Sequence, residues 1–506
     1  MARYIVAMRI DPNLKPADLV PACDRLFELA QGKVRDIDRT WDPKQGTPVF
    51  TVDGQYTTRG WTEWTQGFQY GCPLLCFDAT DDRELLELGR SRTLDHMAPH
   101  VTHMGVHDHG FNNISTYGNL RRLIREGRIE HNEWEMRFYE MALKASGAVQ
   151  AARWSGVAVK EPSPHAANAD SLGYIYSFNG PHSLFVDTMR TSRSLGLAWQ
   201  LGHVLMHEND KSANLLKRSV LHGLCTSQYV VFHGDSPHEY DIRGRTAHEA
   251  VFNPNDGNFR SRAAQQGYSP FSTWTRGLAW ALLGFAEELE LFATIKDAAF
   301  HAACGLARAA VVKVFECCAV ETAGHYLNDV SALDGIPYWD DGAPNLHKLG
   351  DWRARPAEPY NDHEPVDSSA AAIAAQGLIR LGQHLNGKGE APAEPRKREG
   401  ARSPRRLGRS LALPSSPGAN YLAAGLTVAR TLFAEPYLST KKNHQGLLLH
   451  SVYHRPNGWD HVPPGRKIPC GESSMWGDYH ALELALLIKR MATGAPGAPY
   501  LTFFDK

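Results

Sequence analysis

Helical spacing of apolar residues is the feature that most constrains how this 506-residue chain can fold. From Trp274 onward, Leu278, Leu282, Phe285 and Leu289 recur at intervals of three and four, which places them on one face of a helix. Runs that alternate apolar and polar residues, as a half-buried strand requires, are scarce. Helical patterns occupy about residues 64–78, 82–98, 113–125, 131–152, 185–206, 211–232, 274–293, 297–318, 367–385, 419–434 and 475–491.

These helical segments, joined by polar and Gly-rich loops, predict an all-α fold. A toroid of six helical hairpins, the (α/α)6 barrel, and a helical solenoid both fit the pattern, and periodicity alone does not separate them. We expect residues 1–50, with a helix from Ala17 to Ala30, to form an N-terminal lead-in, and residues 51–506 to form a single catalytic domain.

The segment from Asn386 to Gly418 interrupts the helical pattern. It is dense in Pro, Arg, Lys, Gly and Ser and has almost no large apolar residues, so we expect a disordered insertion between two helices. Nucleic-acid binding is an alternative interpretation of its basic residues, which are Arg396, Lys397, Arg398, Arg402, Arg405, Arg406 and Arg409.

Overall charge argues against nucleic acid and anionic membranes as partners. The chain has 54 Lys and Arg against 55 Asp and Glu, so its net charge of -1 creates no field that would recruit either one. The 12 Trp, 18 Tyr and 24 His suit a carbohydrate or another hydroxylated ligand, although large helical enzymes often share such a composition.

The cysteines and the N-terminus predict a soluble, cytoplasmic protein. The 8 Cys are spread along the chain and two are adjacent, Cys317 and Cys318, which is typical of reduced thiols rather than of a disulfide framework. The first twelve residues hold too short an apolar run for a signal peptide, and no stretch is long enough to span a membrane.

Polar and aromatic residues gather at the start of the helix predicted from Trp274. Gln266 precedes a Ser- and Thr-rich turn that would cap the helix, and Arg276 and Trp280 follow in its first turns. The helix dipole disfavours a cation at this end, so Arg276 is a candidate for binding an anion with its planar fork of donors. A surface arginine is the alternative interpretation. From residue type alone, Trp280 is more often a core residue than a ligand contact.

Three histidines and an aspartate lie within seven positions, at His103, His107, Asp108 and His109. Spacing of four between the first two suits metal ligands on one helix face, but the segment is bounded by Gly and no further Glu or Cys pair completes a ligand set. A metal site is therefore the minor alternative, and we expect neither a metal nor an organic cofactor.

Asp187 lies between apolar residues, after Phe185 and before Met189, at the start of a helical pattern. Burial among apolar side chains raises the pKa of a carboxyl group, and a helix N-terminus lowers it, so the balance does not follow from the sequence. A helix-capping aspartate is the alternative interpretation of this residue.

In several motifs the chain resembles the unsaturated glucuronyl hydrolases, glycoside hydrolase family 88. That family has Gln-Gly-Tyr followed by Ser-x-Trp-x-Arg-Gly-Gln-Ala-Trp, which matches Gln266 to Trp280 here. Its Trp-Thr-x-Gly-Phe, His-Asp-x-Gly-Phe and Ile-Asp-x-Met motifs match the segments that contain Trp64, Asp108 and Asp187. Further matches follow in order near His248, Asp367 and Asp478, so the resemblance covers about residues 55–491.

The resemblance implies an (α/α)6 barrel and a pair of catalytic carboxylates, Asp187 as acid and base and Asp108 as its partner. It also implies substrate contacts from Trp64, Phe178, His248, Gln266, Arg276 and Trp280. The implied reaction hydrates the C4=C5 double bond of an unsaturated uronic acid at the non-reducing end of an oligosaccharide made by a polysaccharide lyase. For this reaction Asp187 would have to be protonated near neutral pH.

Two other functions remain open. A related six-hairpin glycosidase could act on a saturated uronide or an unsaturated rhamnogalacturonide, and a protein of the same fold could bind glycans without catalysis. The presence of both Asp108 and Asp187 argues against a simple binder.

Departures from the family pattern predict a changed substrate preference. Pro270 and Phe271 replace two acidic residues, Leu278 replaces Gln, and Phe178 stands where the family often has Trp. If these positions face the substrate, the loss of polar groups should favour less polar or less sulfated saccharides.

Overall fold

The computed structural model of this protein describes residues 8–60, 63–388, 417–494 and 501–505. Most of the insertion expected at 386–418 lies outside these residues. Its two edges are helical, because helix α14 continues to Lys388 and helix α15 begins at Pro417.

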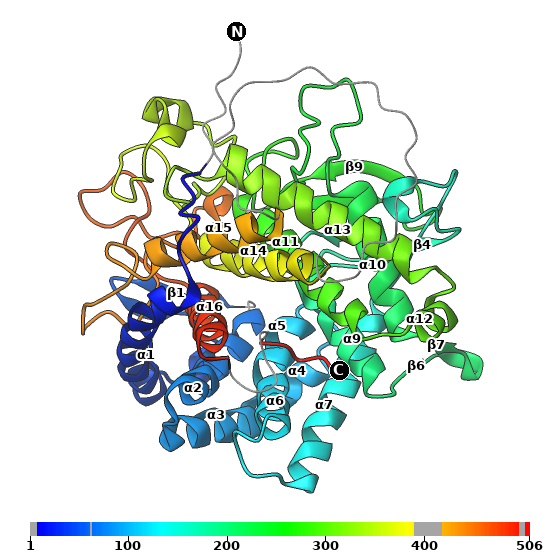
Figure 1. The fold of residues 1–506 in the computed structure, drawn as a ribbon, viewed down its shortest axis with the longest axis horizontal. Helices are drawn as coiled ribbons and strands as arrows, with labels where there is room; N and C mark the ends of the chain where they lie inside the picture. Colours follow the sequence, from blue (N-terminus) through cyan, green and yellow to red (C-terminus); the bar gives the residue numbers. More distant parts are fainter. Residues whose placement is uncertain (1–7, 61–62, 389–416, 495–500, 506) are drawn as a thin grey trace.

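Twelve helical positions of the described chain alternate between an outer and an inner ring (Figure 1), which confirms the (α/α)6 barrel. The outer ring contains α1 (Val20–Thr40), α3 (Arg83–His96), α7 (Glu133–Ala152), α10 (Leu215–Tyr229), α13 (Arg308–His325) and α15 (Pro417–Leu432). The inner ring contains α2 (Gln66–Thr80), α5 with α6 (His109–Asn113, Asn119–Arg125), α8 with α9 (Thr188–Thr191, Arg193–Gln200), α11 (Thr275–Ala293), α14 (Ser368–Lys388) and α16 (Met475–Thr493).

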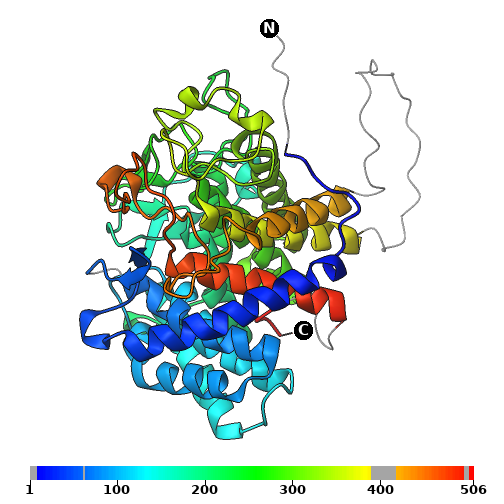
Figure 2. The same ribbon diagram turned by 90° about the vertical axis from the view of Figure 1, so that its left-hand side faces the viewer.

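The ring is closed by the two ends of the chain. Helix α16 packs against both α2 and α1, and Figures 1 and 2 show the last helix beside the first. Residues 20–40, expected in a lead-in, therefore form the first outer helix, whose buried stripe includes Leu26, Phe27 and Ile37. Closure also separates the toroid from an open solenoid.

Small residues and buried ion pairs hold the inner helices together. A Cβ on Gly284 of α11 would come within 2.6 Å of the backbone of Met189 in α8, so only glycine permits this approach. Arg190 of α8 contacts Glu483 of α16 at 3.1 Å and is also paired with Glu287 of α11. Because these charges are fully buried, removing one partner would leave the other uncompensated.

Strands occur only as short pairs and one three-stranded sheet in the described chain. The pairs are β1–β2 (Phe50–Val52, Gln55–Thr57), β3–β4 (Trp154–Val157, Leu172–Ile175) and β6–β7 (Leu205–Met206, Ser212–Ala213). The sheet has the order β5–β8–β9 (Ser183–Phe185, Glu249–Phe252, Phe259–Ala263) and is antiparallel. It places His248 beside the segment that leads into Asp187, since the Val186 N–H donates to the His248 carbonyl.

Two predicted helices are divided or shortened. The pattern at 297–318 is split into α12 (Asp297–Cys304) and α13, because Gly305 takes a left-handed conformation with φ of 74°. The pattern at 185–206 starts as strand β5, and its helices run only from Thr188 to Gln200. The described chain also contains a short helix, α4 (Ala98–Val101), and two π-helical turns, at Ile114–Gly118 and Tyr326–Val330.

Candidate active site

A cavity of about 460 Å³ opens where several inner helices begin. Asp108 and Asp187 are the residues just before α5 and α8, and Trp274 is the residue just before α11. The wall of this cavity is formed by Trp64, Val106, His107, Asp108, Phe178, Asp187, Ala264, Gln265, Gln266, Trp274, Arg276, Trp280, Tyr453, His454, Asn457 and Trp459.

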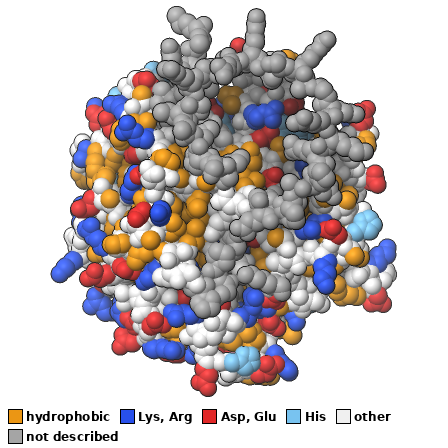
Figure 3. All heavy atoms as spheres, viewed as in Figure 1, with side chains coloured by type: hydrophobic (Ala, Val, Ile, Leu, Met, Phe, Trp, Pro, Cys, Tyr) orange, Lys and Arg blue, Asp and Glu red, His pale blue; other side chains and the backbone are white. Residues whose placement is uncertain are grey.

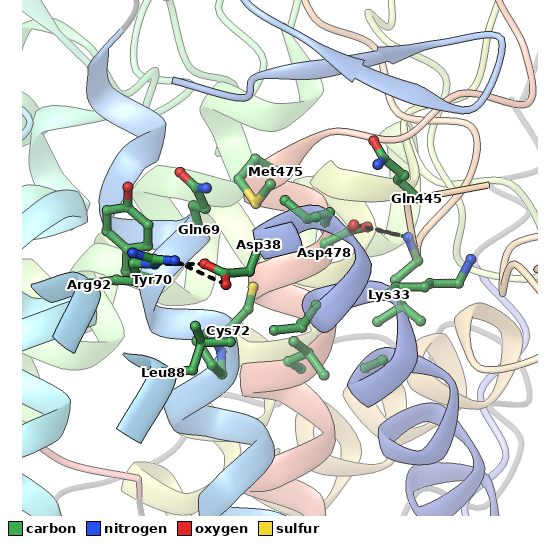
Figure 4. Close-up of a pocket in the computed structure, with 16 residues that line it drawn as sticks. Lys33, Asp38, Gln69, Tyr70, Cys72, Leu88, Arg92, Gln445, Met475 and Asp478 are labelled. Carbon is green, nitrogen blue, oxygen red and sulfur yellow. Dashed lines mark hydrogen bonds and ion pairs between the residues drawn. The ribbon is translucent and has the colours of Figure 1, made fainter. Parts of the chain in front are cut away.

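A second cavity lies between α1, α2 and α16 (Figure 4). It holds only about 30 Å³, and the ion pair between Asp38 and Arg92, 2.7 Å long, closes one side. Lys33 points elsewhere, to the hydroxyl of Ser439 and to two backbone carbonyls. Such a space accommodates about one water molecule, so it is too small for a saccharide.

The two carboxylates of the larger cavity flank one histidine. His107 Nε2 lies 3.4 Å from Oδ1 of Asp187 and 3.7 Å from Oδ1 of Asp108. All three side chains are buried, with 1% to 12% of each exposed. Residues brought together from positions 107–108 and 187 therefore share one charged cluster.

The pKa values of the two carboxylates move in opposite directions. Burial raises the pKa of Asp108, and repulsion from Asp187 adds to the rise while His107 opposes it. Burial also pushes the pKa of Asp187 upward, but the nearby His107 outweighs it and lowers the value overall. The expectation that Asp187 is protonated near neutral pH is thus not met in the substrate-free molecule, because His107 lies beside its carboxylate.

His248 supports the cluster from behind. Its Nδ1 accepts a hydrogen bond from the Gln265 N–H at 2.9 Å, and its ring packs on Phe185 and Trp274. Burial lowers its pKa to about 3, so the ring is neutral. His248 does not line the cavity. We infer that it positions Gln265, with which it shares a hydrogen bond, and the neighbouring Asp187.

Aromatic rings form much of the cavity wall. Trp64 stacks on Trp476 with ring centroids 4.9 Å apart, and Trp280 packs on Phe111 at 4.8 Å. Phe178 is 37% exposed and lies stacked over His107 at 6.0 Å. These three predicted residues, Trp64, Phe178 and Trp280, all line the cavity.

Arg276 also lines the cavity, but its terminal nitrogens contact protein acceptors. Nη1 donates to Asp367, 3.1 Å away, and to the Val452 carbonyl, while Nη2 donates to Oε1 of Gln266 and to the Tyr453 carbonyl at 2.8 Å and 2.7 Å. Its guanidinium is sandwiched near the rings of Trp274 and Trp476. The fork expected to hold an anion thus fixes Gln266 and the loop at 452–453.

That loop supplies residues that sequence reasoning missed. Tyr453, His454, Asn457 and Trp459 form one wall of the cavity, and Asp460 accepts hydrogen bonds from the N–H groups of Tyr453 and His454. Burial raises the pKa of Asp460 to about 6. The density of aromatic and polar residues between Ser451 and Asp460 was the available signal.

The histidines of the first motif do not assemble as a set of metal ligands. Both ring nitrogens of His109 contact protein atoms, Nδ1 the Ser146 hydroxyl and Nε2 the His103 carbonyl, each at 3.0 Å. Within the described ranges, a group with three possible ligand atoms within 4.8 Å consists of Asp53, His461 and Glu472 instead.

Of the departures from the family pattern, only Phe178 belongs to the cavity wall. Leu278 is fully buried inside α11, and Phe271 is 48% exposed and packs on Tyr240 at 4.7 Å. The side chain of Leu278 therefore does not face this cavity.

The surface and the helices add two general observations. Acidic and basic side chains are interspersed on the face shown in Figure 3. Among the helices of the described ranges, none combines the length and the apolar character that crossing a membrane requires.

The fold and the curated relatives together define a class, the glycoside hydrolases with an (α/α)6 toroid. Within this class, the relatives are unsaturated glucuronyl hydrolases, which confirms the resemblance seen in the motifs. No family model matches the chain.

Two curated proteins illustrate the relationship. The chain is 24% identical over 446 residues to the unsaturated glucuronyl hydrolase of Bacillus sp. (strain GL1), covering 87% of this chain and 90% of that protein. It is 23% identical over 515 residues to the unsaturated chondroitin disaccharide hydrolase of Streptococcus pyogenes serotype M1, covering 96% and 98%.

Solved structures share the fold. The crystal structure of the unsaturated glucuronyl hydrolase from Bacillus sp. GL1 matches with a TM-score of 0.63 and 21% identity, over 94% of this chain and all of that one. The enzyme from Streptococcus agalactiae matches with a TM-score of 0.61 and 18% identity, over 98% and 99%.

Proposed function

We propose that this protein is a glycoside hydrolase that releases a 4,5-unsaturated uronic acid from the non-reducing end of lyase-generated oligosaccharides. The observation that carries the proposal is the pair Asp108 and Asp187. Both carboxylates lie within 3.7 Å of His107 Nε2, inside a cavity with aromatic walls. Relatives with this fold are named for the hydrolysis of unsaturated glucuronyl compounds and of unsaturated chondroitin disaccharides.

The chemistry is the hydration of a vinyl ether. Asp187, as a neutral acid, gives its proton to C4 of the substrate, and positive charge develops at C5 and the ring oxygen. In this proposal the carboxylate of Asp108 stabilises that charge. Asp187, now ionised, removes a proton from the water that attacks C5, so it ends the step protonated again.

Opening of the resulting hemiketal breaks the bond between C5 and the ring oxygen and leaves a ketone at C5 and a hemiacetal at C1. Collapse of this hemiacetal then breaks the glycosidic bond and expels the rest of the saccharide. The overall reaction consumes one water molecule and leaves the protonation of Asp187 unchanged. It therefore differs from ordinary glycosidases, whose two carboxylates act on the anomeric carbon.

The remaining wall residues suit binding of the sugar. Trp64 presents aromatic surface, and Trp280 lies buried in the wall with 1% of its surface exposed. His454, Asn457 and the amide of Gln266 offer polar groups for hydroxyls. Arg276 donates hydrogen bonds to the side chain of Gln266 and to the carbonyl of Tyr453. It therefore acts on the substrate by positioning these two residues.

The test is a spectrophotometric assay with a panel of unsaturated disaccharides that differ in linkage and sulfation. We expect loss of the absorbance of the C4=C5 bond with at least one of them, and no loss with the Asp187→Asn variant. Cleavage of saturated uronides without any effect on the unsaturated panel would contradict the proposal and favour the alternative glycosidase.

A further inference from the structure

His107 is a third titratable side chain of the cluster, and the reaction described above does not use it. Its ring is 1% exposed, and its Nε2 lies within 3.7 Å of a carboxylate oxygen of both Asp108 and Asp187. Neither ring nitrogen makes a hydrogen bond of good geometry in the described part of the molecule, and the same is true of Oδ1 of Asp187. Burial of polar atoms without hydrogen bonds is costly unless opposite charges compensate each other. Such atoms in a folded protein therefore call for an explanation, for example a catalytic role.

His109, two residues further on, shows what a structural histidine looks like in the same segment. Both of its nitrogens are satisfied by neutral protein groups, Ser146 and the His103 carbonyl, and burial lowers its pKa to about 3. His107 instead has two carboxylates, those of Asp108 and Asp187, as the neighbours of its Nε2. The two buried rings are therefore built for different tasks.

The position of His107 is fixed by groups other than its nitrogens. Its backbone carbonyl accepts hydrogen bonds from Gln150 Nε2 and from the Thr191 hydroxyl, each at 2.8 Å. Phe178 stacks on the ring, and Phe185 meets it edge-on at 5.7 Å. The nitrogens can thus gain or lose a proton without the loss of the contacts that hold the ring.

Three other ionisable side chains near His107 do not replace it as a source of a proton for Asp187. His222 and His248 are buried and burial lowers the pKa of each to about 3, so both rings are neutral. Arg153 is positively charged, and it opposes a second positive charge on His107. Asp108 and Asp187 outweigh this opposition and the effect of burial, so the pKa of His107 is raised.

We propose that His107 stores the proton that Asp187 delivers to the substrate. This inference rests on the proposed function. In the transfer, the N–H bond at Nε2 breaks and an O–H bond forms at Oδ1 of Asp187. An imidazolium and a carboxylate become a neutral imidazole and a neutral carboxylic acid, so the total charge of the cluster does not change.

Substrate binding supplies the reason for the transfer. A cavity of about 460 Å³ is large enough to admit water, and water beside the charged pair stabilises it. A saccharide that displaces this water lowers the local polarity, and a less polar surrounding favours the neutral pair over the ion pair. Asp187 therefore becomes an acid when its substrate arrives.

The test compares the pH dependence of kcat/KM for the parent protein and for His107→Gln on an unsaturated disaccharide. The profile of the parent loses activity on the alkaline side when the cluster gives up its last proton. Removal of one of the three groups that share this proton lowers the affinity of the cluster for it. The alkaline limb should then move to lower pH by about one unit or more, because a carboxyl group is the weaker base.

His103→Gln is the matched control, since it removes a neighbouring histidine that is not part of the cavity wall. Its profile should keep the position of the parent. An unchanged alkaline limb in His107→Gln would overturn the proposal. Absence of turnover by the parent on every unsaturated disaccharide would instead contradict the proposed function, so the two failures are distinguishable.

A second measurement applies if His107→Gln is unfolded or too slow to give a profile. Nitrogen-15 NMR of the histidine rings in the parent, assigned with His107→Gln or with His107→Asn, reports the protonation of His107 directly. We expect a protonated ring at pH 6.5 in the free protein and a neutral ring when an unreactive substrate analogue is bound. A ring that is neutral at pH 6.5 without the analogue would overturn the proposal.

Discussion

Asp108 and Asp187 carry the same side chain, yet their surroundings give them opposite pKa shifts. Asp187 is the group that has to move a proton to and from carbon and water in the proposed reaction. Asp187→Asn keeps the shape but cannot transfer a proton, so turnover should fall by about 10³-fold or more. Circular dichroism and thermal melting should match the parent, and activity within tenfold of the parent would contradict the assignment.

Arg276 is the second residue whose role depends on its contacts. Arg276→Lys keeps the charge but loses the fork that bonds Gln266, Asp367 and the loop carbonyls. Because the partners stay buried, we expect the free energy of unfolding to fall by about 3 kcal/mol. The melting temperature and kcat/KM should fall together. A higher KM with an unchanged melting temperature would show instead that Arg276 binds the substrate anion directly.

The burial of helix α11 determines the effect of a substitution at Leu278. Leu278 lies on its buried face, so Leu278→Gln would place an amide in the core rather than in the cavity. We expect the free energy of unfolding to fall by about 2 kcal/mol, the cost of a buried and unpaired polar group. Urea unfolding measures this change, with Leu278→Met as the control of similar volume.

Substrate preference provides the other half of that prediction. Ratios of kcat/KM across the disaccharide panel should stay the same in Leu278→Gln as in the parent. Phe178→Trp, which changes a residue of the cavity wall, should alter these ratios. A change of ratios in the Leu278 variant alone would show that α11 presents this position to the substrate.

The toroid as a whole is closed by contacts between its first and last helices, and the insertion does not interrupt this closure. Helices α14 and α15 approach each other closely near the insertion, since a Cβ on Gly418 would come within 2.6 Å of the Gly382 carbonyl. A short Gly-Ser linker can therefore replace residues 389–416. We expect activity and melting temperature close to those of the parent, because the composition of the segment offers almost no apolar surface to bury.

Soluble expression, the melting temperature and kcat/KM of the shortened protein check this expectation. A control with the same linker inserted after Lys388 and all residues retained separates the effect of the junction from the effect of the deletion. Insoluble shortened protein beside a soluble control would show that the segment packs on the toroid.

The order of the amino acids predicts the helices, because the spacing of apolar residues reflects one buried face and does not depend on the partner helix. Its motifs also name residues that line the cavity, which are Asp108, Asp187, Trp64, Phe178, Gln266, Arg276 and Trp280. It did not determine the closure of the ring, which depends on contacts between residues hundreds of positions apart, such as those of Arg190 with Glu483.

The contacts among the residues of the cavity could be known only from the folded chain. His107 between two carboxylates, the bonds that direct Arg276 toward the 452–453 loop, and the place of Tyr453 and Trp459 in the cavity wall are arrangements of distant segments in space. The physical reason is that pKa values and hydrogen bonds depend on distances of a few ångströms, which residue order leaves open until the chain is packed.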